Sequence, residues 1–290
     1  MDTFPLAGHP VRRVGFGAMQ LPGPGVLGPP RDHDEAVSVL RRAVELGVNH
    51  IDTAQFYGPD VSNELIREAL HPYPEDLVLV SKVGAVRDAE GGWPPAQRPE
   101  QLRAGVEDNL RTLGVERLGA VNLRLLGNHE PPPGVDPVPF EDQLAEMGAL
   151  REEGKIDGVG VSNATLEQVE TAIATAALVC VQNAFSLVDQ HDLPVLERCA
   201  EAGIAYVPFF PLGSAFPGMP KVREDATVLR VAEDLGVTPT QVGLAWLLAL
   251  RDNVLLIPGT SSLRHLEENM AVADLELTED AREELSTVRL

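Results

Sequence analysis

Residues 46–58, which read LGVNHIDTAQFYG, contain the pattern that decides the fold. A helical stretch ends near Leu46, Gly47 follows it, and a short apolar run then closes on Asp52. Glycine tolerates the left-handed backbone conformation in which many helices end. A helix, a glycine turn and a strand with a charged end together form the repeating unit of an α/β protein.

The same alternation continues along the chain. Eight short runs, rich in β-branched residues and without a polar alternation, predict strands that are covered on both faces. They are Val14–Met19, His50–Thr53, Leu77–Lys82, Ala120–Arg124, Gly158–Val161, Val179–Asn183, Ala205–Phe209 and Val254–Pro258. Helical patterns lie between them, at Asp34–Leu46, Glu100–Leu113, Phe140–Glu153, Thr165–Thr175, Pro194–Ala202 and Thr227–Leu235, and a further helix begins at Thr238-Pro239. The glycines predicted to end helices are Gly47, Gly114, Gly203 and Gly236.

Eight strands and their helices within 290 residues fit one (β/α)8 TIM barrel domain over residues 1–290. The alternative, a doubly wound sheet, usually carries a G-x-G-x-x-G turn after an early strand. Gly15-Phe16-Gly17 is followed by Ala18-Met19-Gln20, so that fingerprint is missing. Residues 4–14, with Ala7-Gly8-His9 at their centre, predict an N-terminal β-hairpin that closes the barrel floor.

The composition narrows the class of protein. Asp plus Glu number 44 against 23 Lys plus Arg, a formal charge of −21, which repels phosphate backbones and anionic lipid. We therefore expect no nucleic-acid or membrane partner. The two cysteines, Cys180 and Cys199, cannot form a disulfide framework, and the longest apolar run, Val242–Leu250, is too short to span a bilayer. The N-terminus lacks the pattern of a signal peptide, so a cytoplasmic protein is expected.

Three polar residues fall at or beyond strand ends, where a barrel carries its chemistry. Asp52 ends one predicted strand, Lys82 ends the next, and Tyr57 follows Asp52 by five residues. An ammonium at the barrel mouth needs a partner, and Asp52 is the available carboxylate. If Tyr57 lies over the pair, the lysine charge should lower the pKa of the phenol and make it an acid for a carbonyl oxygen. The alternative is a structural ion pair beside a packed tyrosine.

At these residues the chain resembles the aldo-keto reductases. The resemblance rests on residues 47–58 with Asn63-Glu64, and then on Ser81-Lys82, Gly160-Val161-Ser162-Asn163, Val181-Gln182-Asn183, Pro211-Leu212-Gly213 and residues 257–262 with Glu268-Asn269. It covers nearly the whole chain. Gly17-Ala18-Met19-Gln20-Leu21, Val121-Asn122-Leu123-Arg124 and residues 206–213 are similar to the bacterial pyridoxal reductase branch of that family.

The resemblance implies a nicotinamide cofactor, usually NADPH (NADP+), and hydride transfer to an aldehyde or ketone. It makes Tyr57 the proton donor, tuned by Lys82 and Asp52. It assigns Ser162, Asn163 and Gln182 to the nicotinamide carboxamide and Phe209 to stacking on the nicotinamide ring, where the family often has tyrosine. The remaining cofactor positions that it implies are Pro211, Leu212, Gly213, Gly259, Thr260, Ser261, Arg264, His265, Glu268 and Asn269.

The adenine end leaves an alternative open. Gly259-Thr260-Ser261-Ser262 can present N–H groups and hydroxyls to a phosphate at a helix N-terminus, and Arg264 is a candidate fork for a 2′-phosphate. However, the usual phosphate-binding arginine of the family aligns better with His265, so NADPH over NADH is a preference. The alternative for the stretch is an ordinary capped helix with Ser262 as its N-cap.

The main departure from the family is Arg124, which stands where the family usually has an active-site histidine. Asn122 lies two residues earlier on the same face of the strand. An arginine donates hydrogen bonds but cannot shuttle a proton near neutral pH. It could polarise the substrate carbonyl or hold an anionic or phenolic group. His50 is expected to lie deeper in the barrel, without a direct role.

Two long loops, Leu125–Pro139 and Pro211–Glu224, follow predicted strands and are candidate walls of a substrate pocket. Trp93 is either a pocket aromatic or a loop-packing residue. The spacing of His, Cys and carboxylates predicts no metal site.

The leading hypothesis is an NADPH-dependent carbonyl reductase, monomeric or weakly oligomeric, that reduces pyridoxal to pyridoxine with Asp52, Tyr57, Lys82, Arg124 and Asn122 at its reacting centre. One alternative is a biosynthetic aldo-keto reductase that acts on another small-molecule carbonyl, such as a sugar or polyketide intermediate. The other is a catalytically weak NADP(H)-sensing protein that signals to a partner.

Overall fold

Parallel strands form the inner wall of the molecule. The computed structural model describes residues 2–126, 129–130, 136–213 and 219–288. The strands are ordered β10-β9-β8-β7-β5-β4-β3, and every pair of neighbours is parallel. Their bounds are β3 (Phe16–Gly17), β4 (His50–Asp52), β5 (Val78–Ala85), β7 (Leu118–Arg124), β8 (Ile156–Ser162), β9 (Leu178–Gln182) and β10 (Ala205–Tyr206). A short strand, β6 (Pro95–Ala96), pairs antiparallel with the end of β5.

The barrel closes through a segment that is not a regular strand. Val254 bridges Tyr206 and Leu256 bridges Val14, both in the parallel sense, which joins β10 to the residues before β3. The segment Val254–Pro258 therefore lies where a strand was predicted, but it forms isolated bridges rather than a regular strand. Pro258 has no N–H to donate, so the ladder cannot continue to that end.

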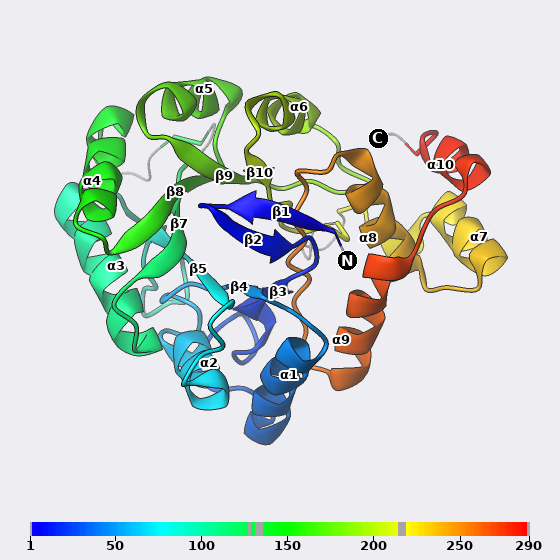
Figure 1. Cartoon of the computed structure of the whole chain (residues 1–290), viewed down its shortest axis with the longest axis horizontal. Helices are drawn as coiled ribbons and strands as arrows, with labels where there is room; N and C mark the ends of the chain where they lie inside the picture. Colours follow the sequence, from blue (N-terminus) through cyan, green and yellow to red (C-terminus); the bar gives the residue numbers. More distant parts are fainter. Residues whose placement is uncertain (1, 127–128, 131–135, 214–218, 289–290) are drawn as a thin grey trace.

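Helices surround the strands, as the alternating pattern predicts (Figure 1). Their bounds are α1 (His33–Glu45), α2 (Val61–Leu70), α3 (Pro99–Leu113), α4 (Phe140–Glu152), α5 (Leu166–Thr175), α6 (Leu193–Ala202), α7 (Ala226–Leu235), α8 (Pro239–Leu250), α9 (Leu263–Met270) and α10 (Glu279–Leu285). Short 3-10 turns lie at Ala18–Gln20, Val222–Glu224 and Ala271–Asp274. Gly114 and Gly203 end α3 and α6 with φ of 69° and 68°, which confirms the predicted glycine caps.

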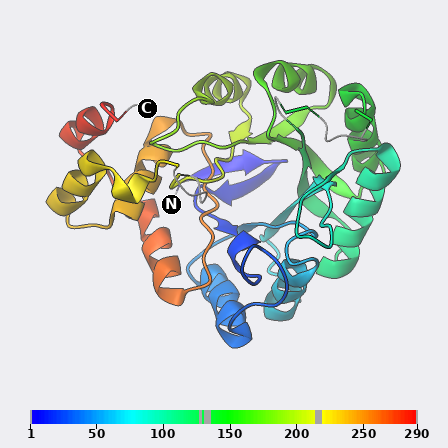
Figure 2. The ribbon, with the colours of Figure 1, turned by 180° about the vertical axis from the view of Figure 1, so that it is seen from behind.

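The N-terminal hairpin covers one end of the barrel. β1 (Thr3–Leu6) and β2 (His9–Arg12) pair antiparallel around Ala7 and Gly8. Leu6 and Val11 belong to the same buried cluster as the inward side chains of the strands, among them Val80, Ala120, Val207 and Leu255. Figure 1 shows the hairpin lying across the opening. The predicted barrel floor is confirmed, and the opposite end, seen in Figure 2, carries the loops that follow the strands.

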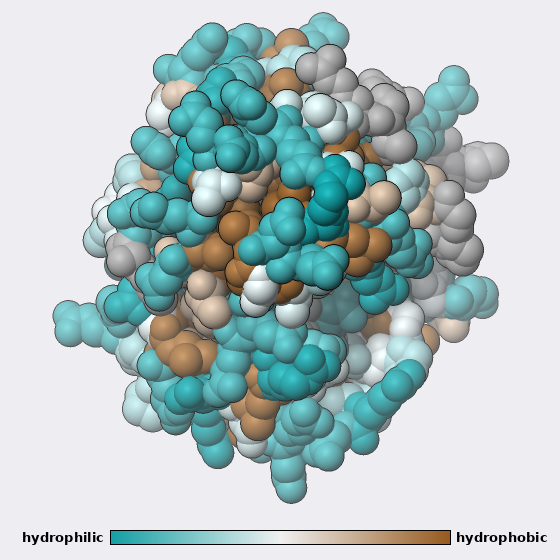
Figure 3. Space-filling model, turned by 90° about the vertical axis from the view of Figure 1, so that its right-hand side faces the viewer, coloured by the Kyte–Doolittle hydropathy of each residue, from teal (hydrophilic) through white to brown (hydrophobic). Residues whose placement is uncertain are grey.

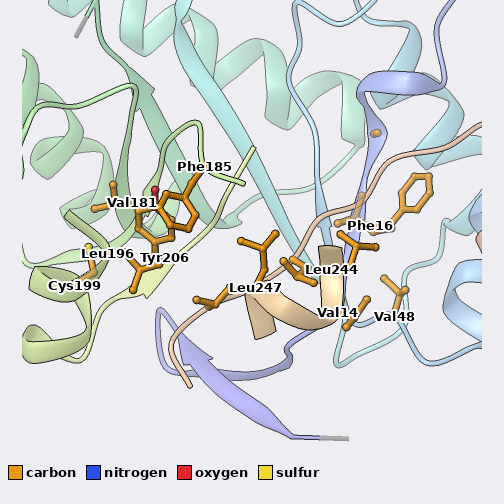
Figure 4. Close-up of a cluster of buried hydrophobic side chains, with 14 of the residues drawn as sticks. Val14, Phe16, Val48, Val181, Phe185, Leu196, Cys199, Tyr206, Leu244 and Leu247 are labelled. Atoms are coloured by element: carbon orange, nitrogen blue, oxygen red, sulfur yellow. The ribbon is translucent and has the colours of Figure 1, made fainter. Parts of the chain in front are cut away.

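The larger core lies between the strands and the helices. Figure 4 shows Phe16 and Val14 near Leu244 of α8, and Phe185 packed against Tyr206. The rings of Phe185 and Tyr206 meet edge to face with their centroids 5.9 Å apart. On the side where α7 to α10 lie, Figure 3 shows a mainly hydrophilic surface with a smaller hydrophobic area, as the acidic composition leads us to expect. Among the described residues, no helix is long and apolar enough to cross a membrane.

Candidate active site

Asp52 and Lys82 form a buried ion pair at the carboxyl ends of β4 and β5. The Lys82 ammonium is bonded to Asp52 Oδ1 and donates to the Thr53 carbonyl at 3.2 Å. Asp52 Oδ2 accepts from Gln182 Nε2 at 3.0 Å. The side chains of Lys82 and Asp52 are only 8% and 5% exposed. The neighbouring strands therefore bring these residues together as predicted, and each polar atom of the pair has a partner.

Tyr57 lies over this pair. Its ring centroid is 5.1 Å from Lys82 Nζ, and the residue is buried. Burial raises the pKa of Tyr57 above its usual range, although the charge of Lys82 acts in the opposite direction. The sequence-based prediction of a lowered pKa is therefore wrong in its net sign, because desolvation outweighs the lysine. The phenol is thus held in the protonated form that an acid needs.

A buried hydrogen-bond network supports the two strands from the outer side of the barrel. Thr53 Oγ1 donates to Asn63 Oδ1 at 2.8 Å, and Asn63 Nδ2 donates to Asn109 Oδ1 at 2.9 Å. Ser81 Oγ donates to the same oxygen of Asn109 at 2.5 Å. Because Thr53 follows Asp52 and Ser81 precedes Lys82, the network fixes the strand ends that carry the ion pair. Single-sequence reasoning missed Asn109, which lies on α3, far from the motif.

The next positions along the strands supply Asn122 and Arg124. In the strand register, Asn122 lies beside Lys82 and Arg124 lies beside Ser162. Asn122 is fully buried; its Oδ1 accepts from Cys180 Sγ at 3.2 Å, and its Nδ2 has no partner in the part of the chain that the structure describes. The contact with Cys180 carried no signal in the sequence, since both residues looked like ordinary strand positions.

Arg124 is a partly buried cation. Burial lowers the pKa of Arg124, and the electrostatic influence of the nearby Tyr57 phenol acts in the opposite direction. No carboxylate among the described residues forms an ion pair with its guanidinium. Since buried charges are normally paired, Arg124 is suited to hold an anionic or strongly polar group of a ligand.

The residues predicted to hold a nicotinamide surround this centre. Gln182 follows Ser162 in the register of β8 and β9, and its Oε1 is buried with no hydrogen-bond partner in the described structure. Asn163 has a left-handed backbone with φ of 58°, and its Nδ2 donates to Leu125 O at 3.1 Å. Phe209 is half-buried and bridges Ala184. An unsatisfied amide oxygen can accept from the carboxamide of a nicotinamide, and a partly exposed aromatic ring can stack on its ring.

Residues 211–213 form a turn beside α8. Gly213 N–H donates to Phe210 O at 2.9 Å, and Gly213 has φ of 87°. A Cβ at Gly213 would lie 2.4 Å from Pro220 O, so only glycine fits there. Pro211 and Leu212 are partly exposed, so they remain available to a ligand.

The predicted adenine end lies at the start of α9. Gly259 packs against β3 so tightly that a Cβ on it would come within 2.5 Å of Gly17 O. Thr260 Oγ1 accepts from Ser262 N–H at 3.1 Å, whereas the Ser262 hydroxyl makes no capping bond. Ser262 is thus the N-cap residue in position only, and the N–H groups of the first turn are free of side-chain caps. This arrangement fits a phosphate.

The charged residues of α9 are mostly exposed. Arg264 Nη1 pairs with Glu268 Oε1 at 2.7 Å, and Arg264 Nη2 lies 2.8 Å from His265 Nε2. Ser261 is exposed, and Asn269 is buried one turn below Arg264 and His265. Arg264, which was predicted to bind a 2′-phosphate, therefore forms an ion pair with a carboxylate of its own helix in this structure.

The remaining predicted residues divide between core and rim. His50 is buried against Gly15, and burial lowers its pKa to about 4, which keeps the ring neutral. Trp93 is half-buried and contacts Phe56 and Tyr57. Large parts of the two predicted wall loops, at 127–128, 131–135 and 214–218, lie outside the described residues.

Comparison with known proteins agrees with this geometry. The model of the aldo/keto reductase family matches residues 13–289. Pyridoxine 4-dehydrogenase of Escherichia coli is 48% identical over 281 residues, which cover 96% of this chain and 95% of that protein. An uncharacterized oxidoreductase of Schizosaccharomyces pombe is 39% identical over 271 residues, 93% of this chain and 84% of that protein.

Solved structures show the same fold. A thermostable aldo-keto reductase in complex with the inhibitor epalrestat has a TM-score of 0.82 and 29% identity, covering 99% of this chain and all of that one. An aldo/keto reductase of Klebsiella pneumoniae in complex with NADP and acetate has a TM-score of 0.80 and 23% identity, covering 98% and 94% of the two chains. The (β/α)8 TIM barrel is confirmed, and so is the similarity to the pyridoxal reductase branch. With the match over residues 13–289 and these relatives, the chain belongs to the aldo/keto reductase family of oxidoreductases.

Proposed function

We propose that this protein is an NADPH-dependent carbonyl reductase in which Tyr57 protonates the carbonyl oxygen, and that its substrate is pyridoxal, reduced to pyridoxine. The observation that carries the proposal is the buried ammonium of Lys82, bonded to Asp52 and 5.1 Å from the Tyr57 ring centroid. Such an arrangement suits proton transfer to a developing alkoxide.

Three residues have separate roles in the proposed proton transfer. Tyr57 holds the proton on its hydroxyl until the carbonyl oxygen gains negative charge. The Lys82 ammonium stabilises the phenolate that the transfer leaves, and Asp52 keeps this ammonium charged despite its burial, since it raises the pKa of Lys82 against the effect of desolvation. Cofactor chemistry would be the delivery of a hydride from NADPH to the carbonyl carbon.

The proposed cofactor-binding residues combine an unpaired polar group, an aromatic ring and an uncapped helix start within the described part of the chain. Gln182 Oε1 can accept from the carboxamide, with Ser162 and Asn163 beside it. Phe209 offers its ring for stacking, and the uncapped first turn of α9 after Gly259-Thr260-Ser261 can hold a phosphate. Aldo/keto reductase structures with NADP and with NADPH support this choice of cofactor.

Pyridoxal is favoured by two independent facts. The Escherichia coli relative at 48% identity is named for a reaction on pyridoxine. Arg124 is a cation without a carboxylate partner among the described residues, and pyridoxal carries a phenolic hydroxyl beside its aldehyde. We assign Arg124 to that oxygen, with Asn122 Nδ2 as a further donor to the substrate. A sugar or a saturated polyketide would offer Arg124 no acidic hydroxyl.

The test is NADPH oxidation by the purified protein with pyridoxal, sugars and simple aldehydes as substrates. The proposal expects the highest kcat/KM with pyridoxal. A sugar or a polyketide aldehyde as the best substrate would leave the reductase assignment intact and overturn the choice of pyridoxal. Tight cofactor binding with no turnover on any carbonyl would favour the sensing alternative instead.

We also retain the prediction of one catalytic domain, acting as a monomer or weak oligomer in the cytoplasm. The family match over residues 13–289 supports one domain, and the buried free thiols of Cys180 and Cys199 fit a reducing compartment. Sedimentation velocity at rising protein concentration tests the oligomeric state.

A further inference from the structure

Three loops that follow consecutive strands are tied together at the barrel mouth. They are residues 18–31 after β3, residues 53–60 after β4 and residues 86–94 after β5. Gly28 N–H donates to Gly58 O at 3.0 Å, which joins the first loop to the second. A Cβ on Gly91 would lie 3.9 Å from Leu27, so the first loop also contacts the third. We call this group of loops the collar.

Arg87 is the cross-link between the first and third loops of the collar. Its Nη2 donates to Gly25 O at 2.5 Å and to Val26 O at 3.1 Å. Its guanidinium carbon lies 4.0 Å from the ring centroid of Trp93. Nε and Nη1 are buried and have no hydrogen-bond acceptor in the described structure. The cation–π contact with the face of Trp93 attracts the guanidinium to the indole, so the two side chains help to hold each other in place.

The other contacts of Trp93 lead to the reacting centre. Its ring meets Phe56 edge to face, with centroids 5.3 Å apart, and meets Tyr57 with centroids 6.0 Å apart. Trp93 remains half-exposed, and the collar also exposes Leu27 and Val86, at 43% and 44%. The collar thus carries exposed apolar side chains and an aromatic ring that contacts the ring of Tyr57, the proposed proton donor.

From this geometry we infer that Arg87 is a positioning residue that fixes Trp93 as an aromatic wall beside Tyr57, and that this wall selects flat aromatic aldehydes over aliphatic and sugar aldehydes. The inference rests on the proposed function and adds a cause of specificity to it. An aromatic substrate gains ring contacts with a fixed indole, whereas the hydroxyls of a sugar lose water against an apolar rim and find no partners there.

The experiment compares Arg87→Met with wild type, with Arg98→Met as the matched control. Arg98 is exposed and pairs with Glu100, and the described structure places no aromatic ring against it. For each protein kcat/KM is measured with pyridoxal, benzaldehyde, butanal and glyceraldehyde, together with the dissociation constant of NADPH. Arg87→Met should lower the ratio of aromatic to aliphatic kcat/KM about three- to tenfold, mainly through KM. Binding of NADPH should be unchanged, and Arg98→Met should resemble wild type. The ratio of aromatic to aliphatic kcat/KM in Arg87→Lys should lie between those of wild type and Arg87→Met. An ammonium keeps the positive charge but loses the planar guanidinium group.

Tryptophan fluorescence gives a second readout that does not depend on turnover. The chain has two tryptophans, so Trp246→Phe leaves Trp93 as the single reporter. In that background, Arg87→Met should increase the quenching of Trp93 by iodide, because the indole loses its cover.

The outcomes separate the two proposals. An active wild type with an unchanged substrate ratio and unchanged quenching in Arg87→Met would overturn the role of Arg87 alone. Absence of turnover with every aldehyde in wild type would overturn the proposed function, and the selectivity of the wall with it.

Discussion

Ion pairs between basic and acidic side chains occur in two regions of this protein, one buried at the barrel mouth and one exposed on the outer surface. Lys82 and Asp52 at the barrel mouth are 8% and 5% exposed. On α3 and the turn after α4, Arg103 bonds Glu153 through both terminal nitrogens at 2.7 and 2.8 Å, and Lys155 bonds Glu107 at 2.6 Å. The side chains of Arg103 and Glu153 are 32% and 41% exposed.

The difference shows that burial, not residue type, decides what an ion pair does. Water screens the outer group, so each of its pairs contributes little to stability. The inner pair is buried, so its charges act strongly on Tyr57 and the loss of one partner is costly.

The largest effect should come from Lys82→Met. This change leaves the Asp52 carboxylate buried without its cation, which should cost about 3–5 kcal/mol of unfolding free energy and abolish turnover. Lys155→Met, the control in the outer group, should cost at most about 1 kcal/mol. Urea unfolding measures both.

A double variant sharpens the same comparison. Asp52→Asn combined with Lys82→Met buries no lone charge, so it should be more stable than Lys82→Met alone, while remaining inactive. Equal instability of the single and double variants would show that packing, rather than the unpaired carboxylate, dominates the inner site.

Arg124→Met should separate substrate binding from stability. It removes a partly buried cation that has no carboxylate partner among the described residues, so the free energy of unfolding should not fall. A hydrogen bond to a charged group is worth about 1.5–3 kcal/mol, so kcat/KM with pyridoxal should drop roughly 10- to 100-fold. With a pyridine aldehyde that lacks the phenolic hydroxyl the drop should be small. A similar loss with both aldehydes would argue that Arg124 contacts the carbonyl oxygen instead.

The pH dependence of turnover should reflect the buried phenol. In the proposed mechanism reduction needs protonated Tyr57, and burial raises the pKa of Tyr57 above its usual value of 10.0. The rate of the chemical step should therefore stay level through neutral pH and decline only in strongly alkaline solution, while oxidation of the alcohol should rise with pH. Stopped-flow rates in both directions measure this. The usual pKa of a histidine is about 6.5. A reduction rate that already falls between about pH 6 and 8 would therefore assign the proton to another group.

The smallest effect is expected in the outer group. The hydrogen bond from Arg103 lowers the pKa of Glu153 from 4.5 to about 2. A lowered carboxyl pKa adds stability that is present above the unfolded-state value and is lost as the pH falls through the folded-state value. Glu153→Gln should therefore weaken the dependence of the unfolding midpoint on pH between these two values and leave turnover unchanged. Acid titration followed by circular dichroism checks it.

The sequence predicted the parts of the molecule that depend on local pattern. Glycine after a helical run and apolar residues before Asp52 and Lys82 are local signals, and the strand ends meet as expected because parallel strands end at one face. The proximity of Asp52 and Lys82 follows from this rule, since Asp52 ends one of two neighbouring parallel strands and Lys82 lies toward the end of the other.

Properties that depend on tertiary packing were not predictable in the same way. The pKa of Tyr57 is raised, whereas the sequence predicted that it is lowered. The cause is burial, to which the neighbouring rings of Phe56 and Trp93 contribute. Arg87 and Trp93 lie in one loop, but Arg87 also donates to Gly25 O and Val26 O in a loop from another part of the chain, and no spacing reveals those hydrogen bonds. The irregular closing segment at Val254 and Leu256 had the composition of a regular strand.

The most direct test of the central claim is a pair of conservative variants, Tyr57→Phe and Tyr73→Phe. Tyr73 is the matched control, since its hydroxyl donates to Leu113 O at 2.6 Å, at the end of α3 and away from the ion pair. Single-turnover reduction of pyridoxal by bound NADPH should slow by about 10²- to 10⁴-fold in Tyr57→Phe, with unchanged affinity for NADPH. Tyr73→Phe should turn over like wild type. Turnover close to wild type in Tyr57→Phe would contradict the assignment of the phenol as the proton donor.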